Sequence, residues 1–209
     1  MEHIDQRNSQ QIWGIEGWGK EGITERLSVL FPAKIAGRSG YHTLTLIYTN
    51  KTGVDLRDIP ELLLPPGSGA ALGIKSGSCF VSYGIQQYLW QDPKKPGRGF
   101  GFFGQAGVSD RNPNPFGWMM LAGLGGTGVA GRGLDRYGAG YLRYTLSSDL
   151  TDALRLLHID LYPEQGVETF YNAAITPWFH VVGDLQVVAP GSRSSGTSTF
   201  AGLSAQIKF

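Results

Sequence analysis

The sequence has little of several things that soluble domains usually contain. Its 209 residues include one cysteine, Cys79, which excludes an intrachain disulfide and a zinc site built from several thiolates. Charged residues make up 17% of the chain, where about a quarter is usual. No window of about 18 apolar residues occurs, so a membrane-spanning helix is excluded. With a net charge of +1 and no basic cluster denser than Lys94-Lys95, we expect no nucleic-acid partner.

Motifs for enzymatic or cofactor chemistry are also missing. The histidines His3, His42, His158 and His180 are scattered without the spacing of metal ligands, and no GxSxG nucleophile motif occurs. Residues Gly123–Gly128 match GxGxxG, but no helix follows, so the stretch predicts a turn and no dinucleotide site. We therefore expect a protein that is not an enzyme and needs no metal or other cofactor.

What the sequence does contain is alternation of apolar and polar residues. Along the last segment, Leu203 and Ile207 fall on one face, whereas Ser204 and Gln206 fall on the other. Strict period-two alternation is typical of a strand whose two faces lie in different solvents. The chain ends on such a strand, at the aromatic residue Phe209.

The same alternation recurs between turn residues, which predicts about nine or ten antiparallel strands with up-and-down connectivity. The expected strands are 23–33, 41–50, 78–90, 100–109, 116–125, 137–146, 166–175, 178–189 and 199–209, with 11–20 as a tenth. One helix is expected at 149–158, capped by Ser148 or Asp149, inside a long loop. The proline-rich stretch 60–66 predicts another loop element.

Composition favours a membrane barrel over a soluble sandwich. A soluble sandwich needs Lys, Glu and Asp on its outer faces, but Gly, Ser, Thr, Gln and Tyr predominate on the polar faces here. Such residues suit the inside of a water-filled barrel, and aromatic residues near the strand ends suit an interfacial girdle. The predicted fold class is therefore all-β, an antiparallel up-and-down transmembrane β-barrel of the outer-membrane type.

Longer motifs in the second half of the chain carry a family resemblance. The runs GFGFFGQAGVSDRNPNPFGWMMLAGLGGTG, DRYGAGYLRYTLS, EQGVETFYNAAITPWFHVVGDLQVVAPGSR and GLSAQIKF together resemble the carbohydrate-selective porins of the OprB type. The resemblance covers about Phe80 to Phe209, and its most distinctive parts are the loop Asn112–Pro115 and the hairpin Gly166–Pro190.

The resemblance implies a function and a location. Members of this family are porins of the bacterial outer membrane with roughly sixteen strands, which pass sugars and other small hydrophilic solutes by diffusion. The expected partners are then these solutes, outer-membrane lipid and the barrel assembly machinery, with a homotrimer as one oligomeric state. The resemblance also implies that Phe209 is the terminal aromatic residue read during assembly.

The chain departs from the family pattern in length and at its start. Family members are about twice as long and begin with a signal peptide, whereas MEHIDQRNSQQIWG lacks one. We therefore expect residues 1–209 to form one partial porin domain, the C-terminal half, with 1–21 poorly defined. Two alternatives stay open: a non-functional or truncated half-barrel, and an outer-membrane adhesin or enzyme on a small barrel that uses the loop 51–77.

The polar faces supply candidate pore-lining residues, which either touch solute or only hydrate the wall. They are Arg26, Gln86, Gln105, Tyr141, Arg143, Glu168, Asn172, Trp178, His180, Asp184 and Gln186. Arg143 and Glu168 lie on strands adjacent in sequence, so we expect that they can form an ion pair, either between neighbouring strands or across the channel. If the last strand ends at the periplasm, the loops 51–77, 110–114, 147–165 and 191–197 are extracellular.

Overall fold

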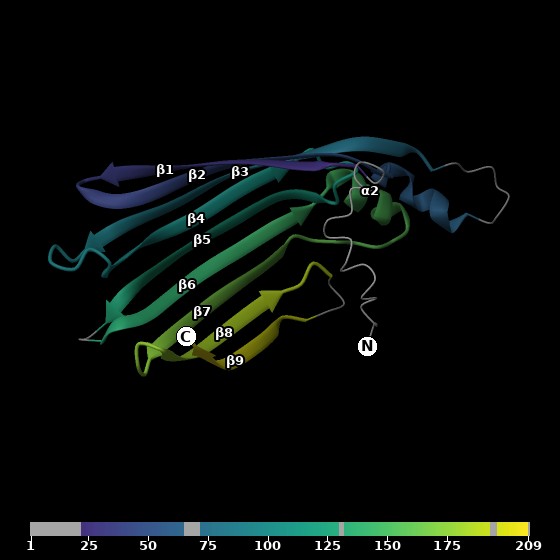
Figure 1. The fold of residues 1–209 in the computed structure, drawn as a ribbon. Helices are drawn as coiled ribbons and strands as arrows, with labels where there is room; N and C mark the ends of the chain where they lie inside the picture. The colour runs from purple at the N-terminus through teal and green to yellow at the C-terminus, as the bar shows by residue number, and fades with distance from the viewer. Residues whose placement is uncertain (1–21, 65–71, 130–131, 193–195, 209) are drawn as a thin grey trace, which may run out of the picture.

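The computed structural model describes residues 22–64, 72–129, 132–192 and 196–208. In this part of the chain, nine strands form a single antiparallel sheet in which each strand pairs with its neighbours in sequence. Figure 1 shows the sheet as a curved wall that runs from β1 to β9. The all-β class and the up-and-down order predicted from the alternation are confirmed.

The strands coincide with the expected ones from residue 23 onward, and several are longer. They are β1 (Thr24–Ile35), β2 (Arg38–Val54), β3 (Ile74–Gln91), β4 (Gly99–Ser109), β5 (Phe116–Val129), β6 (Arg132–Leu146), β7 (Glu164–Ala174), β8 (Phe179–Ala189) and β9 (Ser198–Ile207). The expected tenth strand, 11–20, and the terminal Phe209 lie outside the described residues.

The two ends of the sheet differ in their connections. At one end, which we call the short-turn end, β1 joins β2 through Ala36 and Gly37, with φ of 51° and 76°. Positive φ at both central residues is the geometry of a type I′ hairpin, whose twist matches that of the strands. At the other end, the long-loop end, β2 connects to β3 and β6 connects to β7 through helical segments (Figure 1).

The glycine-rich stretch 123–128 was expected as a turn, and this prediction is wrong. The stretch lies inside β5, where Gly123 pairs with Gly140 and Gly125 pairs with Gly138 of β6. Glycine content misled the prediction because glycine also occurs in strands where another group approaches the backbone closely.

Two helical segments occupy the long-loop end. The 3-10 helix η3 (Leu56–Leu63) follows β2, and the helix α2 (Ser148–Leu156) follows β6. Helix α2 confirms the expected helix, but its N-cap is Ser147, whose Oγ accepts a hydrogen bond from the Leu150 N–H at 3.5 Å. Among the described residues, neither segment nor any other helix is long and apolar enough to cross a membrane.

No dry core lies under the sheet in the described part of the chain. Leu185, Leu203 and Ile207 are 45%, 81% and 54% exposed, so their shared face does not pack against protein. The buried apolar side chains among these residues are Leu56 and Ala153, both in helical segments of the loops. A soluble sandwich would bury one face of every strand, so the sheet is a wall with two open faces.

The strand register defines these two faces. The outer face carries mainly apolar side chains, such as Leu27, Leu46, Val81, Leu124, Val167, Leu185 and Leu203. The inner face carries the residues in between, such as Thr43, Gln86, Gln105, Glu168 and Gln186. Alternation along the strands therefore separates a mainly apolar surface from a more polar one.

A carboxylate joins β6 to β7 on the outer face near the short-turn end. Asp135 is 1% exposed and forms an ion pair with Arg132. It also accepts hydrogen bonds from the Tyr171 hydroxyl and from the Ala174 N–H, the latter at 3.0 Å. The buried charge is thus paired and hydrogen-bonded, as a buried carboxylate requires.

Candidate functional site

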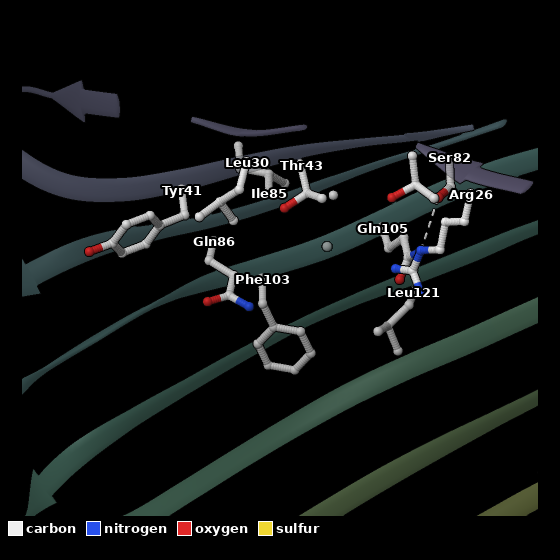
Figure 2. A pocket seen from close by; sticks show the side chains of 13 residues that line it. Arg26, Leu30, Tyr41, Thr43, Ser82, Ile85, Gln86, Phe103, Gln105 and Leu121 are labelled. Carbon is white, nitrogen blue, oxygen red and sulfur yellow. Dashed lines mark hydrogen bonds between the residues drawn. The ribbon is translucent and has the colours of Figure 1, made fainter. Parts of the chain in front are cut away.

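A hollow of about 510 Å³ lies on the inner face of the first five strands. Its side chains include Arg26, Leu30, Tyr41, Thr43, Thr45, Ser82, Gln86, Phe103, Gln105 and Leu121 (Figure 2). Residues of five consecutive strands surround one space only where the sheet curves toward it. The inner face is therefore the concave side of the wall.

Serine and threonine hydroxyl groups line part of this hollow and form hydrogen bonds with its longer polar side chains. The Arg26 Nε–H donates to Ser28 Oγ at 3.0 Å, and the Ser28 and Thr45 hydroxyls lie 3.0 Å apart. The Gln105 amide donates to Ser82 Oγ at 3.3 Å. The predicted residues Arg26 and Gln105 thus lie on the same face, each held by a hydrogen bond to a neighbouring hydroxyl group.

Several other predicted residues share one row across the inner face. The row follows the register of neighbouring strands through Tyr41, Gln86, Phe103, Gly123, Gly140, Glu168 and Gln186. Asp184 lies in the next row, where it pairs with Phe170. The structure therefore brings Gln86, Glu168, Asp184 and Gln186 to the same surface.

Asn172 and His180 also lie on the inner face, nearer the short-turn end. His180 Nδ1 and Asn172 Oδ1 are 2.8 Å apart and form a hydrogen bond between β7 and β8. His180 is only 5% exposed, so this pair braces the wall more than it offers free groups to solvent.

The expected facing of the strand 137–146 is wrong. Tyr141 pairs with Val167 and Arg143 pairs with Met120, which puts both on the outer face. Leu142, expected on the apolar side, belongs to the inner face instead. Because successive side chains of a strand point to opposite faces, placing one residue on the wrong face places all the others on the wrong face as well.

This reversal also removes the expected ion pair. Glu168 is on the inner face and Arg143 is on the outer face, so the sheet separates them. The Arg143 guanidinium instead lies 5.9 Å from the centre of the Trp118 ring, a cation–π contact near the long-loop end of β6. The Tyr141 hydroxyl donates to Gln165 Oε1 at 2.7 Å on the same face.

Trp178 was expected on a strand, and this prediction is also wrong. It lies in the short turn before β8, which begins at Phe179, and it is 56% exposed. The Trp178 carbonyl accepts a hydrogen bond from the Lys208 N–H at 2.8 Å, so the backbone at this residue joins the turn to the end of β9.

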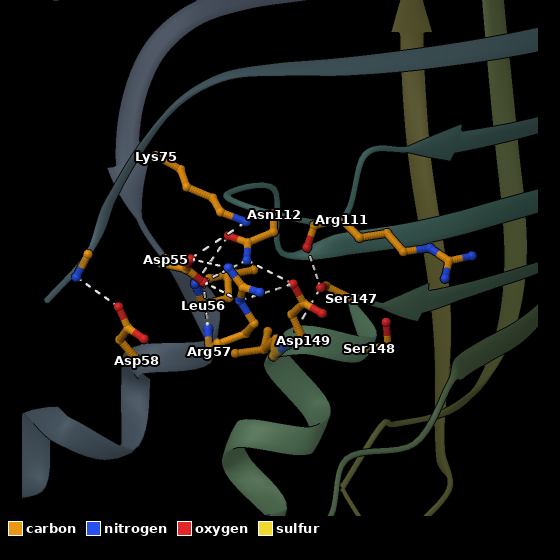
Figure 3. A network of polar contacts seen from close by, with 12 residues as sticks. Asp55, Leu56, Arg57, Asp58, Lys75, Arg111, Asn112, Ser147, Ser148 and Asp149 are labelled. Atoms are coloured by element: carbon orange, nitrogen blue, oxygen red, sulfur yellow. Dashed lines mark hydrogen bonds and ion pairs between the residues drawn. The ribbon is translucent and has the colours of Figure 1, made fainter.

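A polar network that the motifs did not predict joins three loops at the long-loop end (Figure 3). The Asn112 amide donates to Asp55 Oδ1 at 2.7 Å and to Asp149 Oδ2 at 2.8 Å. Asp55 also accepts from the Arg57 guanidinium, with Nη2 to Oδ2 at 2.7 Å, and lies 3.6 Å from Lys75 Nζ. Loops that are far apart in sequence are therefore joined at the long-loop end of the sheet.

The charges in this network shift each other's titration. Side-chain hydrogen bonds from Arg57, and next from Asn112, hold the pKa of the Asp55 carboxyl well below its usual range. The same hydrogen bond with Asp55 raises the pKa of Arg57. Both groups are thus charged at neutral pH, and the network is an ionic one. In the described residues, no group of three His, Cys, Asp or Glu side chains is arranged to hold a metal ion.

Comparisons with known proteins agree with the geometry. Residues 34–209 match the model of a family described as "Carbohydrate-selective porin, OprB family". A solved structure titled "High pH structure of Pseudomonas putida OprB" aligns with a TM-score of 0.82 at 22% sequence identity. The alignment covers 93% of this chain and 50% of that chain, so the chain spans about half the length of the matched protein. No curated protein matches the chain.

Proposed function

Because the chain belongs to the OprB family of carbohydrate-selective porins, we propose that its inner face lines a water-filled channel through which carbohydrates and other small hydrophilic solutes diffuse. Membership of this family places the chain in the bacterial outer membrane and among channels rather than enzymes. In the proposal, solute moves down its own gradient, and selectivity comes from the width and lining of the channel.

The observation that carries the proposal is the difference between the two faces of the sheet. The outer face presents apolar side chains such as Leu203 at 81% exposure, which a lipid environment would cover. The inner face presents a hollow lined by hydroxyl, amide and guanidinium groups together with apolar side chains such as Leu30 and Leu121. One wall with hydrocarbon outside and water inside accounts for both, and no dry core competes with it in the described residues.

Of the predicted lining residues, those on the inner face remain in the proposal. They are Arg26, Gln86, Gln105, Glu168, Asn172, His180, Asp184 and Gln186. A closed channel also needs partners for the outer edges of β1 and β9, because unpaired backbone groups are costly in lipid. We propose that further strands close the wall between these two edges. Binding to the barrel assembly machinery and formation of a homotrimer stay predictions.

Liposome swelling tests the proposed function. Vesicles that contain the purified full-length protein are diluted into isotonic glucose, and swelling is followed by light scattering. We expect rapid swelling in glucose and much slower swelling in a large oligosaccharide, because channel width limits diffusion. Vesicles without protein give the leak rate, and glucose swelling no faster than this leak would overturn the proposal.

A gel assay checks that the protein tested is a folded barrel. A closed barrel resists detergent until heated, so heated and unheated samples migrate differently, whereas an open sheet gives one band. A heat-dependent shift together with glucose entry supports the channel. A shift without glucose entry would favour the alternative of an adhesin or enzyme on a barrel.

A further inference from the structure

A second hollow of about 540 Å³ continues along the inner face toward the short-turn end. It shares Tyr41, Gln86 and Phe103 with the first hollow and adds Arg136 and Phe170. Besides hydroxyl, amide and charged groups, the inner face carries apolar side chains such as Leu121, Leu142, Phe80 and Phe200. Phe103 and Phe170 stand out among them because both line this hollow. Neither was among the predicted lining residues, so their placement needs a physical account.

The Phe103 ring lies along the wall and does not stand up into the channel. Phe103 is on β4, yet a Cβ added to Gly123 of β5 would lie 2.4 Å from Phe103 Cζ. A Cβ added to Gly140 of β6 would lie 3.4 Å from the same atom. A side chain that reaches over the two neighbouring strands must lie flat against them. One face of the ring is therefore turned toward the channel.

The Phe170 ring approaches the same place from the opposite side. Phe170 is on β7, and a Cβ added to Gly138 of β6 would lie 2.7 Å from Phe170 Cε1. Gly123, Gly125, Gly138 and Gly140 form two paired rows on the inner face of β5 and β6. These four positions lack side chains, which leaves the room that both rings occupy.

Free polar groups border the two rings. Gln86 is the direct partner of Phe103 in the register, and Asp184 is the direct partner of Phe170. Glu168 lies opposite Gly140, beside the glycine positions. Within the described part of the chain, the side chains of Gln86, Glu168 and Asp184 form no hydrogen bond or ion pair. Their amide and carboxylate groups are thus available to a solute.

This combination matches the chemistry of a pyranose sugar. A pyranose has apolar C–H groups on the faces of its ring and hydroxyl groups around its rim. Aromatic faces carry partial negative charge and attract the C–H groups, while carboxylate and amide oxygens accept hydrogen bonds from the hydroxyls. A flat aromatic surface bordered by such acceptors binds both parts of the sugar at once, as binding sites with a few placed polar groups do.

We propose that Phe103 and Phe170 form a stacking platform for pyranose rings on the channel wall, with Gln86, Glu168 and Asp184 binding the sugar hydroxyls. The inference rests on the proposed function, because it names the solute class and the place where that solute pauses. A weak site of this kind raises the sugar concentration at the wall while still letting the sugar leave.

Ion conductance in planar bilayers tests the platform separately from the channel. The full-length protein is reconstituted into a bilayer bathed in KCl. The glucose concentration that halves the ion conductance is then measured. Phe103→Leu and Phe170→Leu are each expected to raise this concentration about threefold to tenfold, since each removes one aromatic face from the platform. Phe103→Tyr keeps a flat ring and should retain the value of the unmodified protein.

Matched controls come from other positions of the sheet. Phe179 of β8 belongs to the outer face, where it pairs with Ile207, so Phe179→Leu should leave the glucose effect unchanged. Gly138→Ala forces the Phe170 ring to move and should weaken glucose binding. In Gly140→Ala the nearest atom, Phe103 Cζ, would lie 3.4 Å from the added Cβ, so this variant should have a smaller effect.

A linear hexitol separates stacking from a change in channel width. Sorbitol has the hydroxyls of glucose but no ring face, so the Phe→Leu variants should leave its effect on the current unchanged. Equal sensitivity to glucose in the unmodified protein, Phe103→Leu and Phe170→Leu would overturn the platform, as would an equal change for sorbitol. Failure of the proposed function looks different, because the unmodified protein then fails to pass glucose at all. If a Phe→Leu variant gives no conductance, the comparison of Gly138→Ala with Gly140→Ala decides.

Discussion

Asn112 donates a hydrogen bond to Asp55 across 2.7 Å, although 57 positions separate the two residues in the sequence. The contact joins the loop between β4 and β5 to the loop that begins after β2. Through Asp149, the same amide also reaches the loop that contains α2 (Figure 3). One side chain therefore joins all three loops at the long-loop end, beside the Arg57–Asp149 ion pair and the hydrogen bond from the Ser147 hydroxyl to the Arg111 carbonyl.

Asn112→Ala is expected to loosen these three loops without unfolding the sheet. The substitution removes two hydrogen bonds to carboxylates and one accepted from the Leu56 N–H at 3.2 Å. The free energy for opening the loops should fall by about 2 kcal/mol or more. Limited proteolysis of the intact membrane-embedded protein measures this as faster cleavage within η3 and α2.

Asn114→Ala is the matched control for this prediction. The Asn114 side chain accepts a hydrogen bond from the Phe116 N–H at 3.0 Å, a contact within its own loop. Cleavage of η3 and α2 should therefore stay near the unmodified rate. Equal acceleration by both substitutions would show that Asn112 has no special part in joining the loops.

The loop network should weaken in acid. The pKa of Asp55 is lowered in the folded loops, so its ionised form is stabilised there relative to the unfolded chain. This contribution is fully present above the unfolded value of about 4 and is lost as the pH falls toward the lower folded value. The protection of η3 against hydrogen exchange, corrected for the intrinsic pH dependence of exchange, should be constant from pH 7 down to about 5 and then fall.

Asp55→Asn should remove much of this acid dependence, because the amide does not titrate. Asp152→Asn serves as control, since Asp152 is 66% exposed and pairs only with Arg155 on the surface of α2. If Asp152→Asn and Asp55→Asn alter the acid dependence equally, the effect belongs to general surface charge and Asp55 is not its source.

Ion selectivity should distinguish the two faces of the sheet. Glu168 is on the inner face, so Glu168→Gln should shift the ratio of cation to anion permeability about twofold toward anions at low ionic strength, where screening is weak. Arg143→Gln should leave the selectivity unchanged, because Arg143 lies on the outer face over Trp118. Reversal potentials in a salt gradient measure both. A shift in Arg143→Gln as large as in Glu168→Gln would contradict the assignment of faces.

Asp135 should matter for the stability of the wall and not for transport. Asp135→Asn removes the ion-pair partner of Arg132 and weakens the hydrogen bonds from Tyr171 and Ala174. We expect the folded band on a gel to convert to the unfolded band at a lower temperature. Tyr171→Phe removes a single hydrogen bond and should lower that temperature less. An unchanged transition in Asp135→Asn would show that the cluster is dispensable.

The strands were predictable from the sequence because alternation is a local signal. The order of residues along a strand determines which of them share a face, and the residues of β7 to β9 were assigned to the correct faces in this way. The failure at β6 has the same origin, because Leu142 and Tyr144 looked more apolar than Tyr141 and Arg143. Only the pairing of Leu142 with Leu121, which is a long-range fact, places Leu142 on the inner face.

The candidate site was predictable only in part, for a related reason. Polar residues such as Gln86 and Glu168 stand out on a strand face, but an aromatic residue that lines a channel resembles one that faces lipid. The adjacent pair Phe102-Phe103 carries a signal that was not used, since two consecutive residues of a strand must face opposite sides. The contact between Asn112 and Asp55 leaves no local trace, because loops fold against each other through tertiary structure.

The tight hairpin at Ala36 and Gly37 sets limits on how related sequences diverge. A single residue inserted into β1 or β2 would carry every following side chain of that strand from one medium into the other. Length changes are therefore tolerated in the long loops, whereas a strand takes up a single extra residue only at a β-bulge, as between Tyr88 and Trp90 of β3. Insertions and deletions among relatives should cluster on the side of the membrane that bears η3 and α2.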